Sequence, residues 1–172
     1  MTQGLYLIVL GSNQRHPGHG APHKVIAAAL ASLGRVGITV ERASRVVTSR
    51  PIGPSRRAYA NAAAVIRSKA QPPELLARLQ RIEAEFGRRR RGQRWSARVL
   101  DLDVILWSGG AWASPGLVVP HVMFRTRDFV LGPAVQIAGG WRDPISGMQL
   151  RLRHPVGRDG ESAAVRLAPQ RL

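Results

Sequence analysis

The order of patterned segments in this sequence predicts an α+β fold of the ferredoxin-like kind, with a β-α-β-β-α-β core. The first observation behind this prediction is that segments with strand and helix patterns follow one another in that order, separated by turn-forming residues. The second is that 172 residues, 44% of them hydrophobic and 21% charged, suffice for one domain with a core. We therefore expect a single domain over residues 1–172, in which an antiparallel sheet has helices packed on one face, plus C-terminal additions. The helix-free face of such a sheet can carry a ligand.

The first half of the chain supplies the first three strands and the first helix. Strands are expected at residues 5–10, 39–48 and 59–66, where the residues are apolar or β-branched. Pro22 suits the first turn of a helix, because it lacks only an N–H that has no partner there. We expect this helix to continue through Leu33 and to stop at Gly34.

The second half supplies the remaining core elements and the additions. The prolines at 72–73 open a helix with one apolar stripe, and Gly87 ends it. A basic segment leads from there into a strand at residues 101–106. A further helix is expected at about 128–137, and the basic, poorly patterned tail after about residue 155 is expected to be mobile.

The charge balance narrows the class of partner. The chain has 26 Lys and Arg against 10 Asp and Glu, a formal net charge of +16, which indicates an anionic partner such as a nucleotide or a nucleic acid. The absence of Cys excludes disulfides and thiolate metal sites. The N-terminus does not have the pattern of a signal peptide, and no apolar run reaches the roughly 20 residues that span a bilayer. We expect a cytoplasmic protein that does not bind membranes.

The segment most informative about chemistry is the strand that begins at Asp101. Residues i and i+2 of a strand point to one face, so Asp101 and Asp103 are expected side by side, roughly 6–7 Å apart. The opposite face should point to a core through Leu100, Leu102, Val104 and Leu106. Two neighbouring carboxylates on a half-buried strand repel each other, and a divalent cation shared with substrate phosphates would compensate them. Taken alone, the pair also fits a solvated strand face.

Five motifs in one order extend this interpretation over about 150 residues. They are Leu10-Gly11-Ser12-Asn13; Pro51-x-Gly53-Pro54 with Tyr59-x-Asn61-Ala62; Gln80-Arg81-Ile82-Glu83 leading to Gly87-Arg88; Arg94-Trp95-x-x-Arg98-x-x-Asp101-Leu102-Asp103; and Pro120-His121 with Arg127-x-Phe129-Val130-Leu131. This combination resembles the 6-hydroxymethyl-7,8-dihydropterin pyrophosphokinases of folate biosynthesis. The resemblance implies transfer of the β,γ-pyrophosphoryl unit of ATP to a reduced pterin, with release of AMP.

The resemblance also implies a role for individual residues. Asp101 and Asp103 would hold two Mg²⁺ ions and, with Arg88 and Arg98, would carry the catalysis. The residues implied for ATP are Gln80, Glu83, Arg88, Trp95, Arg98, His121 and Arg127. The residues implied for the pterin are Ser49, Ile52, Tyr59, Asn61, Trp95 and Phe129. Arg90 and Arg94 would belong to a mobile loop that closes over both ligands.

Several departures from the family pattern leave alternatives open. Gly116 and Val118 stand where many members place an Arg and a hydroxyl residue toward ATP, and Val122 stands where an aromatic residue or Pro is common. A degenerate pyrophosphokinase with a weakened ATP site is therefore one alternative. A basic nucleic-acid-binding module is another, although the paired aromatic residues of RNA-binding sheets are missing. We expect a monomer that acts on ATP and a reduced pterin.

Overall fold

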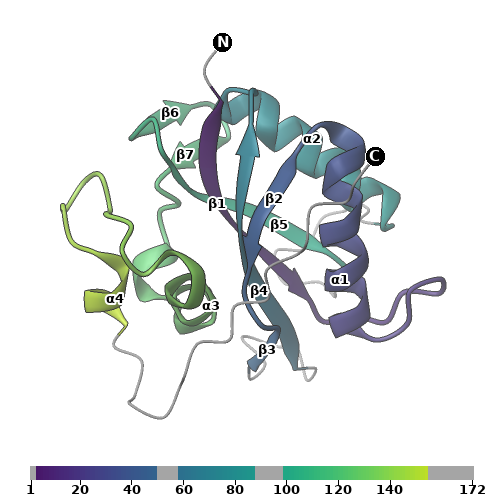
Figure 1. Cartoon of the computed structure of the whole chain (residues 1–172). Coiled ribbons are helices and arrows are strands. Elements are labelled where there is room, and N and C mark those ends of the chain that lie inside the picture. The colour runs from purple at the N-terminus through teal and green to yellow at the C-terminus, as the bar shows by residue number, and fades with distance from the viewer. Residues whose placement is uncertain (1–2, 50–57, 88–98, 155–172) are drawn as a thin grey trace.

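The computed structural model describes residues 3–49, 58–87 and 99–154 (Figure 1). In chain order its helices and strands are β1 (Gly4–Ser12), α1 (Pro22–Ser32), β2 (Thr39–Ala43), β3 (Val47–Ser49), β4 (Tyr59–Ser68), α2 (Pro72–Glu85), β5 (Asp101–Trp107), β6 (Trp112–Ser114), β7 (Leu117–Val119), α3 (Asp128–Ala138) and α4 (Leu150–Arg153). The strands of the main sheet lie in the order β2-β4-β1-β5, β3 also pairs with β4, and every pairing is antiparallel. The predicted fold class is thus confirmed, with β2 and β3 together in the place of one strand.

Helices lie on both sides of the sheet (Figure 1). The two core helices, α1 and α2, pack on the face that carries Ile8, Leu10 and Leu102. The C-terminal helices α3 and α4 pack on the opposite face, against Leu7 and Val9 of β1. The expectation of a helix-free second face is therefore wrong for the part of the sheet under α3, since the C-terminal additions cover it.

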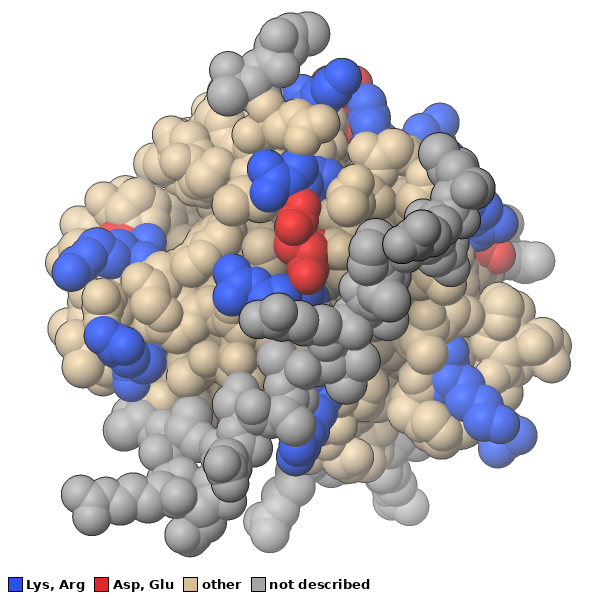
Figure 2. All heavy atoms as spheres, viewed as in Figure 1, with Lys and Arg blue, Asp and Glu red and all other residues tan. Residues whose placement is uncertain are grey.

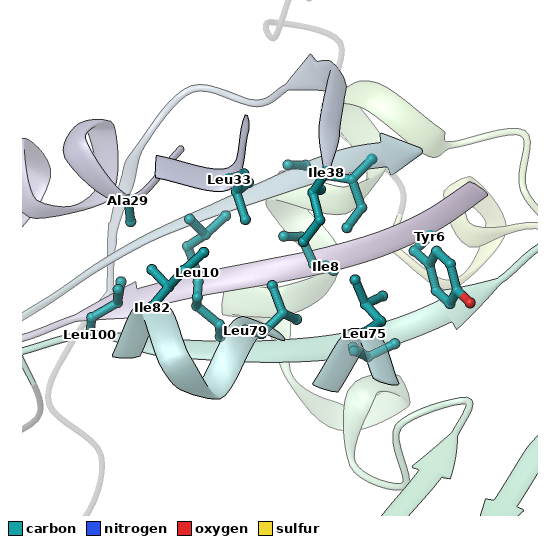
Figure 3. Packing of buried hydrophobic residues seen from close by; sticks show 14 of the residues in the cluster. Tyr6, Ile8, Leu10, Ala29, Leu33, Ile38, Leu75, Leu79, Ile82 and Leu100 are labelled. Atoms are coloured by element: carbon teal, nitrogen blue, oxygen red, sulfur yellow. The ribbon is translucent and has the colours of Figure 1, made fainter. Parts of the chain in front are cut away.

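The larger core lies between β1 and the two core helices. Figure 3 shows Tyr6, Ile8 and Leu10 of β1 pointing toward Leu75 and other apolar side chains of α2, and all of these side chains are fully buried. The Tyr6 hydroxyl donates a hydrogen bond to the carbonyl oxygen of Ala70 at 2.6 Å, and burial raises the pKa of Tyr6 to about 12. This core holds β1 rigidly in the middle of the sheet, where it aligns the strands on either side.

Two boundaries in the first half differ from the prediction. Helix α1 does not stop at Gly34 but continues as a 3₁₀ turn (Leu33–Val36), and the chain leaves it at Gly37, whose φ is 73°. The strand expected at 39–48 is interrupted, because Ser44 bonds to Ala63 of β4 with both its backbone N–H and its side-chain oxygen. In the segment that separates β2 from β3, these contacts to β4 replace ordinary strand pairing.

A bulge in β5 changes the orientation of one predicted core residue. The register with β1 shifts between Leu7 and Ile8, so that Leu7 faces Leu106 while Ile8 faces Val104. Leu106 therefore packs in the cluster under α3, together with its neighbour Ile105. The prediction was right for Leu100, Leu102 and Val104, which face α1 and α2, and wrong for Leu106.

The second half of the chain agrees with the prediction for its helices and adds a hairpin and a short helix. Helix α2 ends at Glu85, and Gly87, two residues later, has a φ of 84°, the left-handed conformation that favours glycine. Helix α3 runs through Pro133 without ending there. The β6–β7 hairpin and α4 were not predicted, because each is only three or four residues per element and shows no period. The predicted mobile tail lies outside the described residues.

Candidate active site

The two aspartates of β5 lie in register with residues of the neighbouring strands. Asp101 lies opposite Gly11 of β1, which lies opposite Asn61 of β4, and Asp103 lies opposite Val9 in the same way. Directly opposed residues of an antiparallel pair point to the same face. Asp101, Asp103 and Asn61 therefore share the α3 face of the sheet, as the alternation in the sequence predicts for the aspartates.

Because Gly11 has no side chain, it leaves space on this face between Asp101 of β5 and Asn61 of β4. A Cβ built on Gly11 would meet the Oδ1 of Asn61 at 3.4 Å. Asn61 is buried, with 2% of its surface exposed, and its Nδ2 donates a hydrogen bond to the Ser49 Oγ at 2.8 Å. Ser49 itself lies opposite Tyr59 in the β3–β4 pair. The structure thus brings together three of the residues implied for the pterin.

His121 is fixed beside β5 by its backbone. Its N–H donates a hydrogen bond to the carbonyl oxygen of Ile105 at 3.0 Å, and its Nδ1 accepts one from the Met123 N–H at 3.2 Å. Burial lowers the pKa of His121, and the charge of Arg127 lowers it further, while the charge of Asp101 acts in the opposite direction. Because Nδ1 is an acceptor, the neutral ring carries its proton on Nε2 and can donate from there.

Arg127 connects His121 to the start of α3. Its guanidinium lies over the Phe129 ring, 5.7 Å from the ring centroid. The charges of Arg127 and Asp101 both act on the His121 imidazole, so both residues lie in its neighbourhood. His121 and Arg127, both implied for ATP, are thus linked to Asp101, a proposed metal ligand, and to Phe129, which is implied for the pterin.

Glu83 and Gln80 lie on α2, which packs on the other face of the sheet from the aspartates. Glu83 is buried, with 2% exposed, and its Oε1 accepts a hydrogen bond from the Leu102 N–H at 2.7 Å. Gln80 lies half-buried one turn earlier on the helix. The structure thus places the Glu83 carboxylate on the backbone of β5, a contact that no sequence pattern indicated.

A buried acidic residue that the sequence did not single out supports the segment between His121 and Arg127. Asp143 is fully buried, and its carboxylate accepts two hydrogen bonds from Arg125, at 2.7 and 2.8 Å. Arg153 of α4 donates a third, at 3.2 Å. Asp143 follows no recognisable spacing, so only its burial and its partners identify it.

Six of the predicted site residues lie outside the described residues: Ile52, Arg88, Arg90, Arg94, Trp95 and Arg98. Their roles stay predictions.

The donor set around Asp101 and Asp103 is compatible with Mg²⁺. Both side chains are half-buried carboxylates on one face, and carboxylate oxygens are ligands that Mg²⁺ prefers. No group of three or more His, Asp or Glu residues that could hold a metal occurs within the described ranges. A pair of carboxylates suits Mg²⁺ that is completed by water and substrate phosphates better than a closed structural metal site.

Among the residues placed in the structure, no helix is both long and apolar enough to cross a membrane.

Comparison with known proteins identifies relatives over most of the chain. A similar protein from Haemophilus influenzae, named 2-amino-4-hydroxy-6-hydroxymethyldihydropteridine pyrophosphokinase, is 37% identical over 133 residues, which cover 76% of this chain and 79% of that protein. A protein of the same name from Pseudomonas aeruginosa is 36% identical over 146 residues, covering 84% and 86%. One from Synechocystis sp. is 42% identical over 120 residues, covering 69% of this chain and 61% of that protein.

A solved structure and a family model agree with these relatives. A crystal structure of Plasmodium falciparum HPPK-DHPS superposes with a TM-score of 0.65 at 9% identity, covering 88% of this chain and 44% of that chain. At this identity the likeness supports the fold alone. The family model described as 7,8-dihydro-6-hydroxymethylpterin-pyrophosphokinase matches residues 7–139. The prediction from the five motifs is confirmed: the chain belongs to the 7,8-dihydro-6-hydroxymethylpterin pyrophosphokinase family.

Proposed function

We propose that this chain transfers the β,γ-pyrophosphoryl group of ATP to 6-hydroxymethyl-7,8-dihydropterin, giving AMP and the pterin pyrophosphate. The observation that carries the proposal is that Asp101, Asp103 and Asn61 share one face of the sheet, and that the charges of Asp101 and Arg127 both act on His121. Family membership supports the same reaction, because the relatives are named for it. In this reaction the hydroxymethyl oxygen bonds to the β-phosphorus. The bond from that phosphorus to the oxygen bridging the α- and β-phosphates breaks, and the hydroxyl proton is lost.

Asp101 and Asp103 would hold Mg²⁺, two ions as the resemblance implies, against the triphosphate. When bound, Mg²⁺ supplies charge neutralisation of the phosphate oxygens and polarises the attacking hydroxyl group. The contribution of the chain is to fix both carboxylates on one face of a strand whose register is set by β1. Positioning of this kind, rather than covalent chemistry by the protein, accounts for most of the catalysis in phosphoryl transfer.

His121 and Arg127 would contact the phosphates. The bond from Met123 to Nδ1 leaves the Nε2–H of His121 as a donor to a phosphate oxygen. The lowered pKa keeps the ring neutral at neutral pH, so His121 orients a phosphate by a hydrogen bond rather than by a full charge. Arg127 supplies a positive charge that does not titrate in this range.

The pterin would lie near Asn61, on the side of Gly11 away from the aspartates. A carboxamide offers both a donor and an acceptor, which suits the edge of a pterin ring. The hydrogen bond to Ser49 holds the Asn61 amide in place, and Gly11 leaves the neighbouring space without a side chain. Tyr59 and Phe129 would contact the ring faces, as the resemblance implies. Monomeric state and cytoplasmic location stay predictions.

The proposal is tested by measuring AMP release from ATP by the purified chain. We expect AMP to appear only when both Mg²⁺ and 6-hydroxymethyl-7,8-dihydropterin are present, and to disappear when EDTA is added. AMP formation that does not depend on the pterin would contradict the assignment, and so would its absence at saturating concentrations of both substrates.

A degenerate enzyme with weakened ATP binding is the second candidate that an observation favours. Val118 and Val122 are 46% and 63% exposed, where many relatives are expected to present polar or aromatic groups. Gly116 lies in the β6–β7 turn with a φ of 78°, a conformation that disfavours residues other than glycine. The presence of Gly instead of the family's Arg therefore also has a structural reason. Calorimetry that found pterin binding but no binding of an ATP analogue would favour this candidate.

The nucleic-acid alternative has less support. Both faces of the sheet carry packed apolar clusters under helices, whereas RNA-binding sheets of this kind use an open face. On the face drawn in Figure 2, Lys and Arg residues lie in separate groups rather than in one continuous stripe. RNA binding that fell steeply with salt and ignored the pterin would revive this alternative.

A further inference from the structure

Among the described residues, strand β5 lies at the edge of the sheet, and β1 is its one partner strand. Its inner side pairs with β1 along the row from Asp101 to Trp107. On its outer side, the side chain of Glu83 and the backbone of His121 both bond to it. The Glu83 Oε1 accepts a hydrogen bond from the Leu102 N–H at 2.7 Å, and the His121 N–H donates one to the Ile105 carbonyl oxygen at 3.0 Å.

The position of Leu102 makes the first of these bonds relevant to the metal site. Leu102 lies between Asp101 and Asp103, and its N–H belongs to the peptide group that joins Asp101 to Leu102. A bond to this N–H limits rotation of that peptide plane, and therefore limits the direction in which the Asp101 Cα–Cβ bond points. Without such a bond, this part of an edge strand would be held mainly by its pairing with β1.

The burial of Glu83 makes its hydrogen bond to the Leu102 N–H structurally important. Only 2% of the residue is exposed, although a buried carboxylate is costly unless it is hydrogen-bonded. The N···O distance of 2.7 Å lies at the short end of the range for N–H···O hydrogen bonds. Glu83 also comes from α2, on the opposite face of the sheet from the aspartate side chains.

We propose that Glu83 is a positioning residue for the metal site, which acts through the Leu102 N–H to align Asp101 and Asp103. This inference rests on the proposed function. It differs from the direct ATP contact that the family resemblance implies, because here the carboxylate acts through the backbone of β5. Residues that orient metal ligands typically contribute roughly 10–100-fold in metal affinity, and we expect an effect of this size.

Two substitutions of Glu83 separate positioning from direct contact. Glu83→Met removes the acceptor while keeping the length of the side chain, and Glu83→Gln keeps an oxygen acceptor while removing the charge. Glu85→Gln is the matched control, because Glu85 lies two residues further on the same helix with its side chain 53% exposed. The readouts are the Mg²⁺ concentration at half-maximal binding of a non-hydrolysable ATP analogue, and hydrogen exchange of the Leu102 amide.

For Glu83→Met we expect the Mg²⁺ midpoint to rise about 10-fold or more and the Leu102 amide to exchange faster. Glu83→Gln should stay within about threefold of the parent midpoint, and Glu85→Gln should be unchanged. An unchanged midpoint in Glu83→Met would overturn the inference, even if the melting temperature fell. An equal rise in Glu83→Gln and Glu83→Met would also overturn it, since charge rather than the backbone bond would then matter.

The design also separates this inference from the proposed function. If Glu83→Met does not fold, Glu83→Gln still decides, because positioning predicts a retained midpoint and direct contact predicts a loss. If the parent chain and Glu85→Gln both lack Mg²⁺-dependent binding of the analogue, the proposed function itself fails and the inference fails with it. A failure confined to the Glu83 variants concerns positioning alone.

Discussion

Replacement of Asp143 by Asn should destabilise the chain more than any other single change of an acid to its amide within the described residues. Asp143 is fully buried, and five hydrogen bonds reach its carboxylate, from Arg125 (two), Arg153, Ser146 and the Ile145 N–H. Both carboxylate oxygens of Asp143 accept hydrogen bonds, but Asn has only one acceptor oxygen. The NH₂ group of Asn would therefore face donors in place of the second oxygen. Two arginines would then lie in a largely buried site without a negative charge.

The magnitude follows from the loss of a buried ion pair. Removing one partner of such a pair costs about 3–5 kcal/mol, a large part of the roughly 5–15 kcal/mol that stabilises a typical domain. For a chain of this size each kcal/mol shifts the melting temperature by about 2–4 °C, so we expect a decrease of roughly 6–20 °C. Asp128→Asn is the control, because Asp128 is 90% exposed and its pair with His154 is long, at 3.5 Å. That variant should lose less than about 1 kcal/mol.

The pH dependence supplies a second arm of the same experiment. Burial raises the pKa of Asp143, but hydrogen bonds from Arg125, Ser146 and Ile145 outweigh it and hold the pKa well below its usual range. A carboxyl group with a lowered folded-state pKa contributes stability that is present above its unfolded pKa, about 3.9, and is lost as the pH falls below it. Urea denaturation followed by circular dichroism should therefore show a difference between parent and variant that is full at pH 7 and shrinks below about pH 4. A loss under 1 kcal/mol at pH 7, or a difference that stays constant to pH 2.5, would refute the reasoning.

Three further predictions concern the site. Asp101→Asn should reduce Mg²⁺-dependent AMP release by about 10³-fold or more, as expected for loss of a metal ligand, with a melting temperature near that of the parent; a residual rate above one tenth would argue against a metal at this residue. His121→Gln should make stability less sensitive to acid. Because the pKa of His121 is lowered in the folded chain, the unfolded chain binds the proton first, and stability is lost as the pH falls below about 6.5. Equal acid sensitivity of parent and variant in denaturation between pH 7.5 and 5.5 would contradict this. Gly11→Ala places a methyl group 3.4 Å from the Asn61 Oδ1, and we expect the KM for the pterin to rise several-fold while the KM for ATP changes less; the reverse pattern in steady-state kinetics would assign this space to ATP.

Local periodicity explains why much of the candidate site could be predicted. Side chains alternate between the two faces of any strand, so Asp101 and Asp103 share one face regardless of how the strand pairs in the sheet. The structure confirms this. The apolar stripe of α2 and its end before Gly87 likewise depend on residues a few positions apart. Such features need only the geometry of one element, so they can be read along the chain.

The remaining features depend on contacts between segments that are distant in the sequence. The bulge that turns Leu106 away from its predicted core arises from the register of β5 against β1. Coverage of the second sheet face by α3 depends on where the chain goes after β7, which no local period encodes. Neither feature could be predicted from the residues of one element.

The sequence by itself determined the family, the α+β class and the pairing of two carboxylates on one strand, because motifs and alternation are properties of neighbouring residues. Only the tertiary structure decided that Glu83 bonds to the Leu102 N–H and that Asp143 joins Arg125 and Arg153. The physical reason is that a buried charge is stable only where its partners converge. That convergence, over separations of 10 to 19 residues here, exists only once the chain has folded.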